Sequence, residues 1–110
     1  MAMVPLLAQA QLFYNNGATV QMNPGARVQV NGAAQNQSGT INVATASAAN
    51  LYITGSLTNN ATINGYGNIH LNGDWINNSV FNAFTGLVSL EGAAQNLSGS
   101  VSTTFYNLTL

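Results

Sequence analysis

Val28-Gln-Val-Asn-Gly32 carries the pattern that decides the fold: an aliphatic residue, a spacer, a second aliphatic residue, another spacer and a glycine. The pentad returns three more times, as Leu51-Tyr-Ile-Thr-Gly55, Ile69-His-Leu-Asn-Gly73 and Val88-Ser-Leu-Glu-Gly92. Successive pentad glycines are separated by roughly 20 residues, a period that is typical of one coil of a stacked β architecture. This period is too short for a helical-hairpin repeat of about 33 residues. The chain is therefore a repeat protein.

Alternation inside each pentad places the aliphatic residues on one face of a strand and the spacers on the other face. If the coils stack, equivalent residues lie above one another. We expect one column of equivalent residues in the interior: Val30, Ile53, Leu71 and Leu90. The neighbouring column should face outward: Gln29, Tyr52, His70 and Ser89.

Asparagine pairs mark turns along the chain, at Asn15-Asn16, Asn59-Asn60 and Asn77-Asn78. Gly and Asn are the residues that tolerate turn backbones best. The chain contains 17 asparagines and 7 glutamines, whose amides can also bond to the same residue one coil away, as in stacked β structures. We expect one set of residues to define the structural repeat: Gly32, Gly55, Gly73, Gly92, Asn15, Asn59 and Asn77.

Two segments that begin with a pentad match each other over more than the pentad itself. Val28–Ile41 and Val88–Val101 share eight identities in fourteen positions. They are separated by the length of three coils, since each coil has roughly 20 residues. The sequence thus predicts an all-β fold, a right-handed parallel β-solenoid or β-helix of about five coils. Residues 11–110 would form this one domain. The alternative is an immunoglobulin-like β-sandwich, which would not require a repeat of this length.

The ends of the chain suggest export and a longer protein. Met3–Ala10 is a short apolar run that closes on Ala8-Gln9-Ala10, the small-x-small pattern of a signal-peptidase site. We interpret residues 1–10 as the remnant of a secretion signal, or otherwise as a capping segment. Thr104–Leu110 has the pattern of a strand without a terminator, so we expect the solenoid to be truncated at its C-terminus.

Charge is nearly absent, since Arg27, Asp74 and Glu91 are the only charged side chains. An average soluble domain has about a quarter charged residues. One arginine cannot supply the phosphate contacts of a nucleic-acid-binding protein or the polybasic patch of a membrane-surface protein. We expect no nucleic-acid partner and no membrane insertion. The lack of cysteine excludes disulfides and thiolate metal sites.

The ionisable residues give little chemistry. His70 is the only histidine, and its pentad position is a solvent-facing spacer. Asp74 and Glu91 have no recognised metal-ligand spacing, and a glycosidase pair would have to flank a sugar-sized cleft that a short solenoid does not offer. We therefore predict that the protein is not an enzyme and has no catalytic residue, metal or cofactor.

Two ligand surfaces can be considered. Tyr52 points outward one coil from His70, so these two residues are the best candidates for contact with surface glycans. Ice binding would need a regular column of threonines. The corresponding pentad spacers are too irregular for that: Asn31, Thr54, Asn72 and Glu91.

Gly92-Ala-Ala-Gln-Asn-Leu-Ser-Gly99, followed by Thr104-Phe-Tyr-Asn-Leu-Thr-Leu110, resembles a segment that recurs in large secreted surface proteins of Bacteroidetes. Such proteins often carry a C-terminal type IX secretion sorting domain. The resemblance covers most of residues 12–110 and implies an exported, adhesin-like β-helical stalk, with no catalytic residues to carry over. The composition is also similar to that of curli-type functional amyloid subunits, although their regular Ser, Gln and Asn spacing is not reproduced.

These observations together favour a non-catalytic structural module that is extracellular or attached to the cell surface. We expect it to self-associate through its open solenoid ends into fibres, or to serve as an adhesin stalk. A carbohydrate-binding β-helical wall is the alternative.

Overall fold

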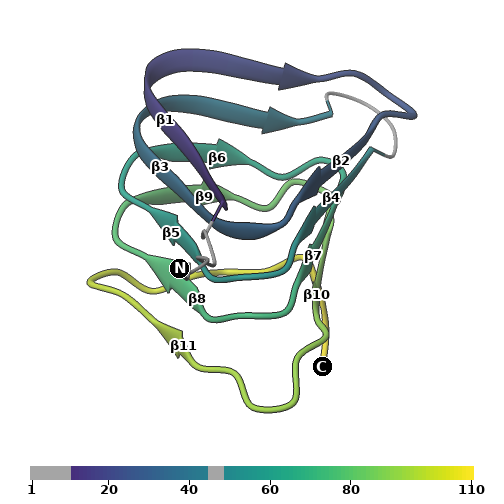
Figure 1. Ribbon diagram of the computed structural model, residues 1–110, viewed down its shortest axis with the longest axis vertical. Coiled ribbons are helices and arrows are strands. Elements are labelled where there is room, and N and C mark those ends of the chain that lie inside the picture. The colour runs from purple at the N-terminus through teal and green to yellow at the C-terminus, as the bar shows by residue number, and fades with distance from the viewer. Residues whose placement is uncertain (1–10, 45–48) are drawn as a thin grey trace, which may run out of the picture.

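The computed structural model describes residues 11–44 and 49–110, in which every regular element is a β-strand (Figure 1). The predicted secretion-signal remnant or capping segment, residues 1–10, lies outside the described residues. Among the described residues there is no helix of the length and apolar character needed to cross a bilayer.

The described residues form twelve strands. They are β1 (Gln11–Met22), β2 (Arg27–Val30), β3 (Gly32–Val43), β4 (Asn50–Ile53), β5 (Leu57–Asn59), β6 (Thr62–Asn64), β7 (Asn68–Leu71), β8 (Trp75–Asn77), β9 (Val80–Asn82), β10 (Leu87–Leu90), β11 (Leu97–Ser98) and β12 (Asn107–Thr109). Every pairing between them is parallel. Parallel pairing confirms the predicted β-solenoid and is incompatible with the antiparallel sheets of an immunoglobulin-like sandwich.

The strands form three walls that wind around a common interior (Figure 1). The long β3 bends, so that its first half pairs with β5 and its second half with β6. The first wall contains the first halves of β1 and β3, followed by β5, β8 and β11. The second wall contains the second halves of β1 and β3, followed by β6 and β9. The third wall has the order β12-β10-β7-β4-β2.

The solenoid has about four turns, with roughly 21 residues between equivalent positions, close to the predicted five coils of 20 residues. The five strands of the third wall enclose these four turns. On this wall Arg27 aligns with Asn50, Asn50 with Asn68 and Asn68 with Leu87. The number of residues between each aligned pair equals the number of residues between the corresponding successive pentad glycines. The sequence repeat is therefore the structural register.

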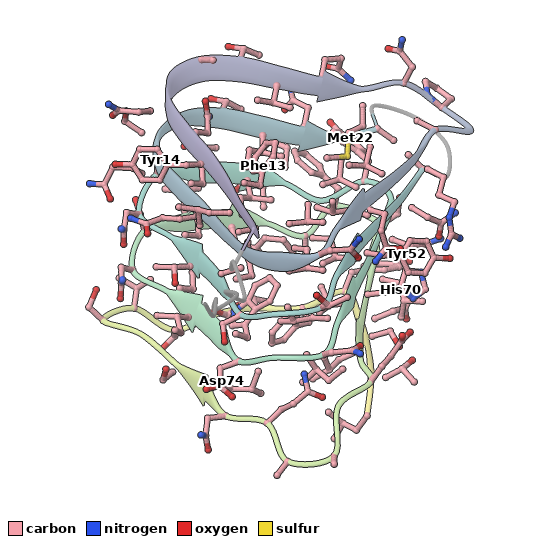
Figure 2. The ribbon with its side chains drawn as sticks, viewed as in Figure 1. Phe13, Tyr14, Met22, Tyr52, His70 and Asp74 are labelled. Carbon is pink, nitrogen blue, oxygen red and sulfur yellow. The ribbon has the colours of Figure 1, made fainter. Side chains whose placement is uncertain are left out.

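The interior column of the third wall forms as predicted. Val30, Ile53, Leu71 and Leu90 are aligned and are at most 8% exposed. The aligned outward column contains Gln29, Tyr52, His70 and Ser89. Ser89 departs from the prediction, because it is only 8% exposed. Full burial of one aliphatic side chain contributes about 1.5–3 kcal/mol, so the stacked columns are the main source of stability. At the N-terminal end, Phe13 and Met22 also point into the interior (Figure 2).

The pentad glycines stack at the corner that joins the third wall to the first. The Gly55 N–H donates to the Gly32 carbonyl at 2.8 Å, and the Gly73 N–H donates to the Gly55 carbonyl at 2.9 Å. A Cβ on Gly55 would lie 2.7 Å from the Gly32 backbone, and one on Gly73 would lie closer still to that of Gly55. These positions require glycine because successive backbones touch there.

The last turn departs from the repeat. Gly32–Val43 is one continuous strand, whereas the matching segment after Gly92 pairs only at Leu97–Ser98. Ala94 matches Ala34 in the two similar segments, and Ala34 lies in the same column as Trp75. The residue that pairs with Trp75 is nevertheless Leu97, three residues after Ala94. The Gln95 side chain explains the shift, because its amide accepts from the Gly92 N–H at 2.7 Å and donates to the Leu71 and Gly73 carbonyls.

A fifth strand of the third wall lies beyond this irregular turn. Leu108-Thr-Leu110 has the aliphatic alternation of a pentad. Residues Asn107, Leu108 and Thr109 of this strand align with Leu87, Val88 and Ser89 of β10.

Candidate functional site: ladders and open ends

A buried asparagine ladder runs along the bend between the first and second walls. Its members are Asn15, Asn36, Asn59 and Asn77, which are 4, 0, 1 and 1% exposed. Successive side chains are joined by Nδ2 to Oδ1 hydrogen bonds of 2.9, 3.1 and 2.9 Å. Three members were expected from the sequence. Asn36 was missed because Asn36-Gln37 breaks the Asn-Asn pattern, although its distance along the chain from Asn15 and from Asn59, close to one coil in each case, would have identified it.

Backbone partners orient the ladder amides. Asn36 Nδ2 also donates to the Thr62 carbonyl at 2.9 Å, and Asn59 Nδ2 donates to the Val80 carbonyl at 2.8 Å. A carbonyl can only accept a hydrogen bond, so these contacts establish which atom of each amide is the nitrogen. Each ladder amide therefore donates to the next member toward the C-terminal turn, and Asn15 Nδ2 also donates to the Ala18 carbonyl of its own turn. Among the described residues no buried side-chain nitrogen or oxygen lacks a partner.

The two ends of this ladder differ chemically. At the C-terminal end, Asn77 Nδ2 and Trp75 Nε1 both donate to Thr103 Oγ1, at 3.2 and 3.1 Å. The Thr103 hydroxyl keeps its own hydrogen as a donor. At the N-terminal end, Asn15 Oδ1 accepts from the Ala18 N–H at 3.1 Å, its one donor among the described residues. Asn59 Oδ1, inside the stack, accepts from two donors. One end thus offers a donor and the other an acceptor.

A second column runs along the outer face of the third wall and brings together the predicted glycan candidates (Figure 2). The guanidinium carbon of Arg27 lies 4.0 Å from the centroid of the Tyr52 ring. The Tyr52 and His70 rings stack at 4.2 Å with an angle of 9° between their planes. His70 Nδ1 lies 2.6 Å from Glu91 Oε2, and its Nε2 lies 3.1 Å from Asn50 Oδ1. Two of the three charged residues of the chain therefore flank one aromatic stack.

This arrangement covers both faces of the Tyr52 ring. Strand β4, which carries Tyr52, lies between β2 and β7, so Arg27 and His70 approach from opposite sides. A sugar ring stacks on a free aromatic face, and Tyr52 has none to offer. Only its edge and hydroxyl face solvent, which weakens the case for Tyr52 as a glycan platform.

The His70 contact also changes the acidity of its partner. Its hydrogen bond to Glu91 lowers the pKa of that carboxyl below the ordinary value of 4.5, although burial acts in the opposite direction. The Glu91 side chain is 41% exposed, so solvent screens the pair and its contribution to stability is modest.

Catalytic and metal chemistry has few groups to work with. Asp74 accepts a hydrogen bond from the Asn96 N–H at 2.9 Å, whereas Glu91 is engaged by His70. Within residues 11–44 and 49–110, no three His, Cys, Asp or Glu side chains gather into a group that could hold a metal ion. The void enclosed by the apolar interior near Met22 measures about 10 Å³, about the space of one water.

The exposed large apolar side chains gather at the two ends of the solenoid. Nine of them occur among the described residues: Leu12, Tyr14, Val80, Phe84, Leu97, Val101, Tyr106, Leu108 and Leu110. The first two lie on β1, and the other seven lie on or after β9, the last strand of the second wall. None lies in residues 15–44 or 49–79. The middle turns thus expose no large apolar side chain, whereas the first and last turns bury some, such as Met22 and Val30, and expose others.

Comparison with protein-family models, curated proteins and solved structures found no match to this chain. The resemblance to Bacteroidetes surface proteins and to curli subunits therefore stays a prediction.

Proposed function

We propose that this chain is a non-catalytic structural module of an extracellular or cell-surface protein, and that it associates with further copies through its open solenoid ends. The observation that carries the proposal is the distribution of exposed apolar side chains. Leu108 continues the interior column of Val88, yet it is 37% exposed. Leu110 follows β12 in the same alternation and is 87% exposed. A further turn stacked on them would bury this surface, and burial of apolar surface drives association.

The strand edges support the same function. Within residues 11–44 and 49–110, strands β1 and β2 each pair on one side only, as do β9, β11 and β12 at the other end. An unpaired edge is a template for another strand, and natural proteins commonly block such edges with charged residues. This chain has no lysine and a net charge of −1, so little repulsion opposes stacking.

The extracellular setting rests on the sequence. The Ala8-Gln9-Ala10 pattern and the resemblance to secreted surface proteins both favour export. A fibre subunit and an adhesin stalk use the same property, which is a stack of turns held in register by buried asparagines. A glycan-binding wall is the weaker candidate because Arg27 and His70 cover the faces of Tyr52.

A concentration series by light scattering, followed by electron microscopy, tests the proposal. We expect assembly that grows with concentration and, in ordered filaments, an axial repeat of about 4.8 Å. Leu110→Lys should suppress assembly by placing a charge among the exposed apolar residues of the C-terminal end. Thr54→Lys, at an exposed spacer of a middle turn, is the matched control and should assemble normally. A chain that stays monomeric into the millimolar range would contradict the proposal.

A further inference from the structure

We infer that the copies stack head to tail, so that the C-terminal turn of one copy lies on β1 and β2 of the next. The inference rests on the proposed function and adds the direction and the register of the assembly. It predicts a polar filament with one exposed N-terminal end and one exposed C-terminal end.

The polarity of the asparagine ladder supports this direction. Each ladder amide donates to the next member toward the C-terminal turn, where the Thr103 hydroxyl has a hydrogen left to donate. The N-terminal turn presents Asn15 Oδ1, which has one acceptor position left beside its bond from Ala18. Head-to-tail contact places the donor end against the acceptor end. Head-to-head contact would place two acceptors against each other, so neither Asn15 Oδ1 could gain a second hydrogen bond beside the one from Ala18.

The walls of the two end turns also match. On two of the three walls the last turn supplies a strand, β11 on the first and β12 on the third, and the first turn supplies the first half of β1 and β2 to these walls; on the second wall the described last turn has no strand to set against the second half of β1. Continuation of the columns would set Leu97 of one copy under Phe13 of the next, because Phe13, Ala34, Leu57, Trp75 and Leu97 share one column. Leu108 would likewise meet Val28 of the next copy.

The direction of the strands gives a third argument. Every strand pair of the described residues is parallel, and only head-to-tail stacking keeps the new pairs parallel with the same inward and outward alternation. Contact of this kind joins two different surfaces, so it does not close on itself and produces an open filament. The occupant of each end is therefore a second copy of this chain.

Single-cysteine variants can read out the direction, because the natural chain has no cysteine. Gln29 and Thr109 belong to the same outward column, at its first and last strands, and both are exposed. In a head-to-tail stack they lie on neighbouring strands about 4.8 Å apart. This separation falls in the usual range of Cα distances for a disulfide, about 4.4–6.8 Å.

The experiment mixes Gln29→Cys with Thr109→Cys, each carrying a tag of different mass, at a concentration where light scattering detects assembly. Under mild oxidation we expect mixed dimers to exceed each homodimer at least fivefold. Thr54→Cys, on a middle turn, replaces Thr109→Cys in the control mixture and should give no such excess.

Each other outcome overturns the inference in a distinguishable way. Assembly with homodimers of Gln29→Cys in excess means head-to-head contact, which removes the polarity and leaves the proposed association intact. Assembly without a mixed-dimer excess means that the ends do not meet in this register. The absence of both assembly and cross-links removes the proposed association and the inferred direction together.

Discussion

Asn36 and Asn59 lie 23 residues apart and share a buried side-chain hydrogen bond of 3.1 Å at the bend between two walls. Asn59 passes the ladder on to Asn77 and also donates to the Val80 carbonyl. Its amide therefore holds three successive turns in register. A buried polar group without a partner costs about 1–3 kcal/mol, so the ladder penalises any slip of one turn against the next.

Asn59→Ala should lower the free energy of unfolding by at least about 2 kcal/mol, because it leaves Asn77 Oδ1 and the Val80 carbonyl without their donor. Urea unfolding monitored by circular dichroism measures the change. Asn60→Ala is the matched control, because the Asn60 side chain bonds to Gln37 and Asn78 on the exposed outer face. We expect it to lose less than about 1 kcal/mol. Equal losses for the two variants would mean that burial of the ladder does not matter.

Gly73→Ala should be far more damaging than Gly25→Ala. A Cβ on Gly73 would overlap the Gly55 backbone, and neither backbone can move without breaking the stack. Gly25 has φ of 83° but nothing within 4 Å of its Cβ position, so alanine there meets only the left-handed backbone strain of about 1–2 kcal/mol. Thermal unfolding of the two variants gives the comparison. If Gly25→Ala were the worse, backbone conformation rather than close approach would explain the glycines of this fold.

The third wall could be predicted from the sequence because each of its features leaves a local mark. Alternation shows which residues face inward, and the spacing of Gly32, Gly55 and Gly73 gives the register directly. The last turn could not be predicted in the same way. Gly92 begins a near copy of the segment that starts at Gly32. The Gln95 side chain, however, folds back and bonds to the backbone of Gly92, Leu71 and Gly73. Sequence similarity shows which turns are alike but not which side chain caps the last of them.

The functional candidates show a related limit. The pattern correctly placed Tyr52 and His70 side by side on the outer face. It gave no sign that Arg27 would lie over the ring, because Arg27 belongs to the neighbouring outward column and reaches Tyr52 diagonally. Contacts between columns depend on side-chain length and direction, which periodicity does not encode.

Tyr52→Leu should destabilise the fold by about 1–2 kcal/mol, because it removes the cation–π contact from Arg27 and the stack on His70. Gln29→Leu, in the same outward column, is the control and should change stability little. Because both ring faces are already covered, we expect any glycan binding found on an array to persist in the Tyr52 variant. A glycan signal that disappeared while stability was retained would restore Tyr52 as a binding residue.

The His70–Glu91 pair predicts a small dependence of stability on pH. The pKa of Glu91 is lower in the folded protein than its ordinary value of 4.5, because His70 bonds to the carboxylate. The pair therefore stabilises the folded state fully at pH values above the ordinary pKa of the carboxyl. This stabilisation is lost as the pH falls through the lowered pKa of Glu91 in the folded protein. Glu91→Gln should cost under about 1 kcal/mol at pH 6 and nothing at pH 2, since exposed pairs are weak. A difference that stayed constant between the two pH values in urea unfolding would exclude the pair as its source.

The two segments of near-identical sequence offer a matched test of the last turn. The Gln95 side chain bonds to Gly92, Leu71 and Gly73, whereas the side chain of its counterpart Gln35 bonds, among the described residues, only to the exposed side chain of Gln37. Gln95→Ala should release the last turn, because the Gly92 N–H and the Gly73 carbonyl lose the amide that joins them. Hydrogen exchange should then accelerate at least tenfold in residues 92–110 and leave residues 28–43 unchanged.

Gln35→Ala should alter exchange in neither segment, although it makes the same change in the same local sequence. Equal effects at the two positions would mean that Gln95 is not the cap of the C-terminal turn. Because that turn also forms the inferred contact with the next copy, Gln95→Ala should weaken assembly as well, and Gln35→Ala should not. The different behaviour of two equivalent glutamines would then separate the end of the solenoid from its interior.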